Sequence, residues 1–224
     1  MSPNKRSLDY LSVSYSTKSK PVTSYPLDLI TYLTSRLGIS RGSVIDVGCG
    51  RGDQLLAFQK LGFQICGLDI EDSCRDIDNH HICDISIDPF PFPDNSFDIV
   101  FSKAVIEHLY IHQIEHFMQE LLRIAKPGAP IVLLTPDWHF LYRDFYEEFT
   151  HVTPFTQRSL QQCMQMYGID SVSVESFIQL PFVWRYPWLT FLCDIFNFLP
   201  LPRSTCKLVR WSKDRVLLGI GRKP

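Results

Sequence analysis

The 224-residue sequence lacks several features that would point to other classes of protein. It has no basic excess, because 22 Lys and Arg stand against 24 Asp and Glu, for a formal net charge of -2. A nucleic-acid-binding domain usually carries a basic surface, so we expect no nucleic-acid partner. No run of about 18 uninterrupted apolar residues is present, so we expect no membrane-spanning helix. The first 20 residues lack the apolar core of a secretory signal.

Cysteine usage bears on the cellular compartment. The seven cysteines are odd in number and include no C-x-x-C pair, which favours reduced thiols over a disulfide framework. We therefore expect a cytoplasmic protein, with peripheral attachment to a membrane as an alternative. The chain is long enough for one domain with a substantial core, and its 45% hydrophobic content is ordinary for a globular protein.

The most informative stretch is an apolar segment that breaks into glycines at alternate positions. Residues 43–47 contain a single acid, Asp46, and are typical of a buried parallel strand. A helix is expected from about residue 54 to 61. Glycines allow a sharp turn and a close approach of a ligand to the main chain, and the helix start offers N–H groups. The pattern therefore predicts a ligand cradle. The glycines are Gly48, Gly50 and Gly52.

The rest of the chain alternates between expected helices and strands, which is typical of an α/β fold. A lead-in helix is expected over 25–37, with Gly38 as its end. Further helices are expected over 111–125 and 156–167. Strands are expected at about 63–70, 81–83, 97–102, 129–136, 169–180 and 215–221.

This ordered set resembles the class I S-adenosylmethionine-dependent methyltransferases. The stretch DVGCGRGD is similar to the family's first motif, and GLDI, FPFPDNSFDIVFSKAVIEHL and LLRIAKPGAPIVLLTPD follow it in the family's order. The resemblance covers roughly residues 44–168. It implies a Rossmann-like α/β fold with helices on both faces of a seven-stranded, mostly parallel sheet. The antiparallel last strand should lie between strands five and six.

The resemblance also implies S-adenosylmethionine as the cofactor. Asp69 lies about 20 residues beyond the Gly-rich loop, where a βαβ unit places an acid that accepts hydrogen bonds from ribose hydroxyls. Asp84 would bind the adenine amino group while Ile85 packs on its ring. Cys49 is interpreted as a small filler residue of the loop, since no base is evident beside it. The expected cofactor-binding residues are Asp46, Gly48, Cys49, Gly50, Asp69, Ile70, Asp84, Ile85, Ser102, Lys103 and His108.

Candidate catalytic residues follow from the proton chemistry of a hydroxyl acceptor. Such an acceptor benefits from a base with a pKa near neutral, as histidine has. His151 lies where the resembled family has a His that faces the acceptor, and it is the first candidate for a general base. His139 is the second, and His108 and Asp137 come after them. Glu107 and His108 are expected to face either the ligand or the sheet.

No metal site is expected. His80 and His81 lie near Cys83 and Asp84. Adjacent residues of a strand point to opposite faces, so two such ligands rarely converge on one ion.

An aromatic segment at about 181–205 exceeds the short hairpin that would suffice between the last two strands. Between residues 181 and 202 its only charges are Arg185 and Asp194, and that Asp and the flanking prolines argue against a spanning helix. Four roles stay open: an extra helix on the domain, a contact with a membrane interface, a cap over an apolar acceptor, and a homodimer contact.

The sequence therefore predicts a tail and lead-in helix over residues 1–43 and a methyltransferase domain over residues 44–224. Its activity would be methyl transfer from S-adenosylmethionine to a small-molecule, sugar- or lipid-type acceptor, at a hydroxyl oxygen. Two alternatives remain. A catalytically silent interaction module would fail to bind the cofactor, and a nicotinamide or flavin oxidoreductase would require the G-x-G-x-x-G spacing that this loop lacks.

Overall fold

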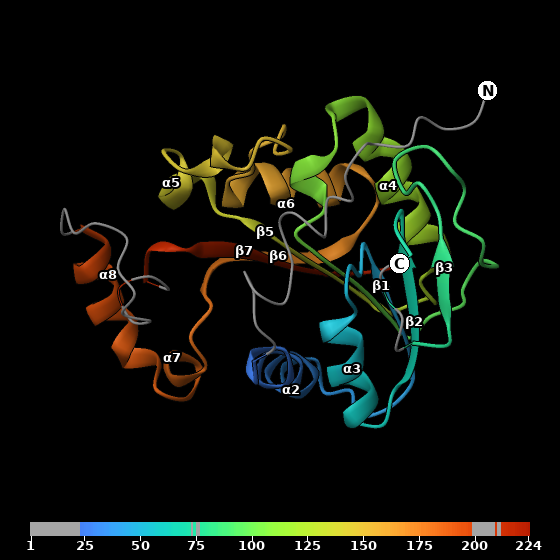
Figure 1. The fold of residues 1–224 in the computed structure, drawn as a ribbon, viewed down its shortest axis with the longest axis horizontal. Coiled ribbons are helices and arrows are strands. Elements are labelled where there is room, and N and C mark those ends of the chain that lie inside the picture. The colour runs from blue at the N-terminus through green and yellow to red at the C-terminus, as the bar shows by residue number, and fades with distance from the viewer. Residues whose placement is uncertain (1–22, 73, 75–76, 199–208, 210–211) are drawn as a thin grey trace.

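A seven-stranded sheet organises the computed structural model, which describes residues 23–72, 74, 77–198, 209 and 212–224 (Figure 1). The spatial order is β3-β2-β1-β4-β5-β7-β6. The first five strands run parallel, and β7 is antiparallel to both β5 and β6. The predicted fold class and strand order are thus confirmed. The strands are β1 Ser43–Val47, β2 Gln64–Asp69, β3 His80–Ile82, β4 Ile99–Lys103, β5 Pro130–Pro136, β6 Asp170–Ile178 and β7 Arg215–Arg222.

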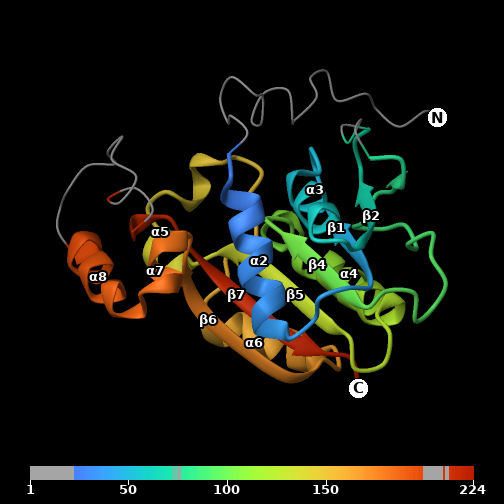
Figure 2. The same ribbon diagram turned by 90° about the horizontal axis from the view of Figure 1, so that it is seen from below.

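Helices cover both faces of the sheet, as expected. Figures 1 and 2 show α4 and α6 on one face, and α2, α3 and α7 on the other. α5 lies near α6, and α8 lies beyond the carboxyl end of β6. The helices are α2 Tyr25–Leu37, α3 Asp53–Lys60, α4 Ile111–Ile124, α5 Trp138–Leu141, α6 Gln157–Met166, α7 Pro181–Arg185 and α8 Thr190–Phe198. The 3-10 segments are η1 Ile106–His108, η2 Phe145–Glu147 and η3 Pro187–Leu189.

Each face of the sheet has its own apolar core. On one side Phe117 and Leu121 of α4 pack with Leu160 of α6, and on the other Leu29 and Leu33 of α2 pack with residues of α3. Alternate residues of the strands supply both cores, because side chains of a strand point to opposite faces. This explains why the strands read as nearly continuous apolar runs in the sequence.

The ends of the elements follow local chemistry. α2 stops at Gly38, whose φ of 68° continues no helix. α6 starts at the capping residue Thr156, which exchanges hydrogen bonds with Ser159. The E-H-L segment does not open a regular helix, because its first two residues belong to the short 3-10 segment η1. Ala104, two residues before η1, has a left-handed φ of 59°.

Two predicted segments fall partly outside the described residues, namely the N-terminal tail over 1–22 and the end of the aromatic segment over 199–205. Among the residues that the structure does describe, none of the helices has the length and apolar character needed to cross a membrane.

Strand directions decide which edge of the sheet can bind a ligand. The carboxyl ends of β1, β2, β4 and β5 meet at one edge, which is where ligands sit in open α/β sheets. β6 runs parallel to β5, because both are antiparallel to β7. The aromatic segment that follows β6 therefore starts at this same edge.

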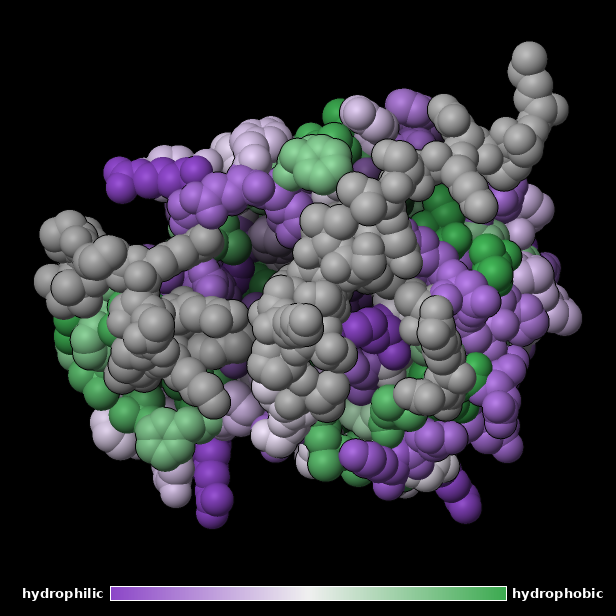
Figure 3. All heavy atoms as spheres, in the orientation of Figure 1, coloured by the Kyte–Doolittle hydropathy of each residue, from purple (hydrophilic) through white to green (hydrophobic). Residues whose placement is uncertain are grey.

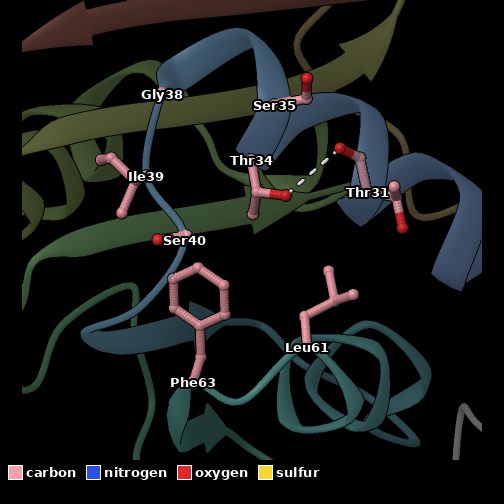
Figure 4. A pocket seen from close by; sticks show the side chains of 8 residues that line it. All are labelled: Thr31, Thr34, Ser35, Gly38, Ile39, Ser40, Leu61 and Phe63. Carbon is pink, nitrogen blue, oxygen red and sulfur yellow. Dashed lines mark hydrogen bonds between the residues drawn. The ribbon is translucent and has the colours of Figure 1, made fainter.

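A hollow of about 400 Å³ lies at the opposite edge, between α2 and the segments that precede β1 and β2 (Figure 4). It is lined by Thr31, Thr34, Ser35, Gly38, Ile39, Ser40, Leu61 and Phe63. The Thr34 hydroxyl donates to backbone carbonyls of its own helix. None of these eight side chains titrates near neutral pH, so the chemistry of the molecule must be sought at the carboxyl edge.

Candidate functional site

The Gly-rich loop folds back onto the end of β2. The backbone N–H groups of Gly48 and Cys49 donate to the carbonyl of Leu68 at 2.7 and 3.2 Å, and that of Gly50 donates to Oδ2 of Asp69 at 2.8 Å. The N–H groups of these three loop residues are therefore hydrogen-bonded within the protein and are not offered to a ligand. The N–H groups offered to a ligand must come instead from the first turn of α3, which no side chain caps.

Asp46 lies beneath this loop at the end of β1 with a side chain only 2% exposed. Its Oδ1 has no hydrogen-bond partner among the described residues. Burial and the nearby carboxylate of Asp69 raise the pKa of Asp46 to about 8, and the Lys103 ammonium acts in the opposite direction. A buried carboxylate oxygen without a partner indicates a place for a polar or cationic group of a ligand.

Lys103 closes the other side of this space from the end of β4. Burial lowers the pKa of Lys103, and the carboxylates of Glu107, Asp46 and Asp53 act against that shift. The structure thus brings together two of the predicted site residues, Asp46 and Lys103, with Asp69 beside them.

Asp69 has a structural task in addition to its predicted one. Its two carboxylate oxygens accept the N–H groups of Gly50 and Glu71 at 2.8 and 3.0 Å, so it ties the Gly-rich loop to the turn after β2. Ile70 is half-exposed next to it. Each oxygen keeps a second lone pair, so the ribose role stays a prediction.

Asp84 and Ile85 lie after β3, at the same edge. Oδ1 of Asp84 accepts the N–H and the hydroxyl of Ser86 at 3.1 and 2.6 Å, which forms a tight turn. Ile85 is partly buried against the core on the α4 side. Their proposed contacts with adenine stay predictions.

Two predicted cofactor residues turn their side chains away from the site. The Ser102 hydroxyl is buried and donates to the carbonyl of Val47 at 2.7 Å, so it joins β4 to β1 and is not offered to a ligand. The Cys49 side chain is buried with Cys74, and hydrogen bonding to Cys74 together with burial raises the pKa of the Cys49 thiol. Cys49 is therefore a filler, and only its backbone can border a ligand.

A second group of titratable side chains gathers on η1, past the end of β4. Glu107 is fully buried, and its Oε2 accepts the Thr135 hydroxyl at 2.9 Å. Its Oε1 has no partner within the described part of the chain. Burial raises the pKa of Glu107 to about 7, while the bond from Thr135 and the charge of Lys103 lower it.

The loop before α6 packs against η1 and brings His151 beside His108. The N–H groups of Val152 and Thr153 donate to the Glu107 carbonyl at 2.9 and 3.0 Å. The His108 and His151 ring centroids then lie 4.8 Å apart. Burial and the neighbouring His151 lower the pKa of His108.

The hydrogen bonds of these two rings fix their neutral tautomers. Nδ1 of His151 lies 2.7 Å from the carbonyl oxygen of Phe145, and Nδ1 of His108 lies 3.2 Å from that of Thr150. A carbonyl oxygen only accepts, so each Nδ1 carries a proton, and in the neutral form of each ring Nε2 carries the lone pair. Nε2 of His151 also lies 3.7 Å from a carboxylate oxygen of Glu148.

The other two candidates for a base are not part of this group. His139 is exposed on α5 with its ring against Phe140. Asp137 is buried, but its two oxygens accept the N–H of His139 and the hydroxyl of Ser176. The structure thus favours His151 over the second candidate and gives Asp137 a structural role.

Sequence reasoning left the role of Glu107 open. Its partner Thr135 and its neighbour His151 are 28 and 44 residues away along the chain, so spacing could not reveal the group. The available signal was an acid at the end of an otherwise apolar strand-to-helix segment. The left-handed backbone of Ala104 nearby is a second sign, since such strain is common at functional sites.

Comparison with known proteins places this geometry in context. The profile of a family described as "Methyltransferase domain" matches residues 22–174. The chain is 26% identical over 189 residues to ajmaline N-methyltransferase of Rauvolfia serpentina, which covers 77% of this chain and 55% of that protein. It is 24% identical over 123 residues to sterol 4-C-methyltransferase of Caenorhabditis elegans, which covers 48% of this chain and 36% of that protein.

The fold is also similar to a solved structure, a SAM-dependent methyltransferase from Archaeoglobus fulgidus. The TM-score is 0.67 at 19% identity, over 96% of this chain and 100% of that one. The alignments with the two curated relatives span about half of their length or less.

Proposed function

Because the chain belongs to the methyltransferase-domain family, we propose that it transfers a methyl group from S-adenosylmethionine to an acceptor of small-molecule, sugar or lipid type. The atom methylated in this proposal is a hydroxyl oxygen. The two curated relatives carry N- and C-methyltransferase names, so the choice of oxygen rests on the chemistry of the site.

The unpartnered Oδ1 of buried Asp46 is the observation that carries the proposal. S-adenosylmethionine carries a positive sulfonium and an ammonium group, and it supplies a methyl group already activated for displacement. The pKa of Asp46 is about 8 without a ligand, and a bound cation would lower it, so that the ionised carboxylate provides the counter-charge in a place that water fills poorly. In addition to Asp46, the parts of the chain that would border the cofactor are the backbone of the Gly-rich loop, Asp69, Ile70, Asp84, Ile85 and Lys103.

His151 supports a hydroxyl acceptor. Its Nδ1 donates to the Phe145 carbonyl, so its Nε2 can receive a proton. A hydroxyl group must lose its proton to become a good nucleophile, whereas a neutral amine needs no such help. The chain's own part in catalysis would be this proton transfer and the alignment of the acceptor.

The aromatic segment supports an apolar part of the acceptor. Apolar side chains gather over α7 and α8 in Figure 3. In this segment Phe182 of α7, Trp188 of η3 and Phe191 of α8 are 61%, 71% and 68% exposed. Their segment starts at the ligand edge of the sheet. We propose that this surface receives the lipid-like portion of the acceptor, and peripheral membrane contact or a homodimer would use the same surface.

Titration calorimetry with S-adenosylhomocysteine tests the cofactor site. We expect micromolar binding by the wild type and a loss of at least about tenfold in affinity for Asp46→Asn, because the variant keeps the shape but loses the counter-charge. Asp72→Asn, an exposed acid near the same site, is the matched control and should bind normally. Asp69→Ala is less informative, because it would also release the Gly50 N–H.

A well-folded wild type that fails to bind S-adenosylhomocysteine would overturn the proposal and favour a silent interaction module. Binding of a nicotinamide dinucleotide in its place would favour the oxidoreductase alternative.

A further inference from the structure

Three side chains near the proposed acceptor position converge on one small volume. Each of Glu107, His108 and His151 offers an atom of a kind that binds metals, and these atoms all lie within 4.8 Å of one another. Among the described residues, no other group of three or more such side chains converges in this way. The four neighbours considered from the sequence, residues 80, 81, 83 and 84, form no such group there.

The buried carboxylate of Glu107 lacks a partner at the point where the group meets. Its Oε2 is held by Thr135 at 2.9 Å, whereas Oε1 is completely buried and accepts no hydrogen bond from the described residues. Leaving a buried carboxylate oxygen unpaired is costly unless a ligand compensates for it. Packing alone does not explain an acid at this position.

The two histidines have the supporting contacts of metal ligands. A ligating His usually donates its second ring N–H to a carbonyl or a carboxylate, which fixes the ring and turns the other nitrogen to the ion. His151 donates to the Phe145 carbonyl at 2.7 Å and His108 to the Thr150 carbonyl at 3.2 Å. Both arrangements leave Nε2 as the nitrogen with the lone pair.

We propose that Glu107, His108 and His151 hold a divalent transition-metal ion beside the methyl-transfer site. Two imidazole nitrogens and one carboxylate oxygen suit ions such as Mn²⁺, Fe²⁺, Co²⁺ and Zn²⁺ better than Mg²⁺ or Ca²⁺, which prefer oxygen ligands alone. Glu148, whose carboxylate lies 3.7 Å from Nε2 of His151, supplies further negative charge next to the ion.

The geometry needs only a small adjustment. Ligands bind such ions at about 2.1 Å, so two ligand atoms of one ion can lie no more than about 4.2 Å apart. A contraction of the widest separation by about half an ångström is within the reach of side-chain rotations.

The ion would also have a task in the reaction, and this step rests on the proposed function. Three protein ligands leave coordination positions open, and an acceptor hydroxyl bound there would release its proton to water more easily, so that the oxygen could attack the methyl carbon while S-adenosylhomocysteine leaves. His151 would then be a ligand of the ion, and the ion would replace it as the group that activates the hydroxyl.

Co²⁺ binding by the full-length chain tests the site. Chelator-treated protein is titrated with Co²⁺ and followed by calorimetry and visible absorption, which reports nitrogen ligation. We expect one ion per chain in the wild type, and a loss of affinity of more than about tenfold for Glu107→Gln and for His151→Gln. The matched control is His112→Gln, an exposed histidine on the adjacent helix α4, which should bind Co²⁺ as the wild type does.

S-adenosylhomocysteine binding by the same variants separates this inference from the proposed function. His151→Gln that keeps S-adenosylhomocysteine binding and loses Co²⁺ would support the metal site. Wild-type protein that binds no Co²⁺ at 1:1, or His151→Gln that binds it as the wild type does, would overturn the metal site whether or not the cofactor binds. Glu107 is fully buried, so impaired folding is an alternative cause of any loss in Glu107→Gln, and His151, whose side chain is 11% exposed, decides the outcome.

Discussion

At the scale of single residues, the ligand edge holds polar groups that the fold does not satisfy by itself. Asp46 and Glu107 each bury one carboxylate oxygen without a partner among the described residues. A buried polar group left unpaired costs about 1–3 kcal/mol. This part of the molecule therefore gives up stability in exchange for binding and chemistry.

Replacing Asp46 by Asn should stabilise the chain in the absence of the cofactor, and more so at high pH. The folded pKa of Asp46, about 8, lies above its ordinary value of 3.8. Ionisation therefore opposes folding, and stability is lost as the pH rises from about 4 to 8. Thermal unfolding of Asp46→Asn should show little gain at pH 4.5 and the full gain near pH 8.5, of about 1–3 kcal/mol. An equal loss of stability at both pH values would contradict this account.

Gly48→Ala should be more harmful than the same change at Gly62. Both residues have a left-handed backbone, with φ of 78° and 87°, so both substitutions cost about 1 kcal/mol of strain. An added Cβ at Gly48 would also lie 2.2 Å from Cγ2 of Val105, whereas at Gly62 it would meet no atom within 4 Å. Urea denaturation should show an additional loss of about 1–3 kcal/mol for Gly48→Ala. Similar losses for both variants would mean that Val105 moves aside freely.

At the scale of elements, the aromatic segment is anchored at one side and exposed at the other. Trp184 of α7 stacks on Phe177 of β6 with ring centroids 5.1 Å apart, and its indole N–H donates to the Ile178 carbonyl at 2.7 Å. Arg215 of β7 pairs with Asp194 of α8 and lies over the Phe140 ring of α5. The segment is therefore packed on the domain as added helices, and one apolar side remains exposed.

Two tryptophans of this segment should respond differently to truncation. Trp184→Ala should lower the free energy of unfolding by about 3 kcal/mol, because it removes a packed ring and its hydrogen bond. Trp188→Ala should change it by less than about 0.5 kcal/mol, because that side chain is 71% exposed. Chemical denaturation of both variants measures the difference. If Trp188→Ala proved as destabilising as Trp184→Ala, the exposed apolar surface would have to be covered in solution.

At the scale of the whole molecule, Asp98 joins three elements at the edge opposite the site. Asp98 precedes β4, and its Oδ2 accepts hydrogen bonds from the N–H and the hydroxyl of Ser43 in β1, both at 2.8 Å. Its Oδ1 accepts a hydrogen bond from the ammonium of Lys126, after α4, at 2.8 Å. These bonds lower the pKa of Asp98 to about 2, with the bond from Lys126 as the largest cause.

Asp98→Asn should therefore weaken the fold in a way that depends on pH. A depressed folded pKa contributes stability above the ordinary value of 3.8, and this contribution is lost as the pH falls towards 2. The variant should unfold at a lower temperature than the wild type at pH 6, and the difference should fade between about pH 4 and 2. Asp94→Asn, at a more exposed acid that pairs with Arg123, is the control and should have a smaller effect. A difference that stays constant down to pH 2 would contradict the assignment.

The sequence by itself determined the fold, and it predicted the cofactor side of the site. Apolar runs of strand length, the glycine stops and the spacing of Asp69 are local signals, and each reports on residues close together in the chain. The strand order did not follow from these local signals but from the resemblance, because the motifs follow each other as in the resembled family. Element ends were off by one or two residues, since caps such as Thr156 lie outside the hydrogen-bonded turns.

Only the tertiary structure decided which side chains face the site. Ser102 and Cys49 lie at the predicted positions but turn into the protein, and Asp137 is held by Ser176 across the sheet. His151 joins Glu107 because backbone bonds from Val152 and Thr153 dock one loop onto η1. Such contacts join residues about 25 to 55 positions apart, and no period or spacing in the sequence encodes them.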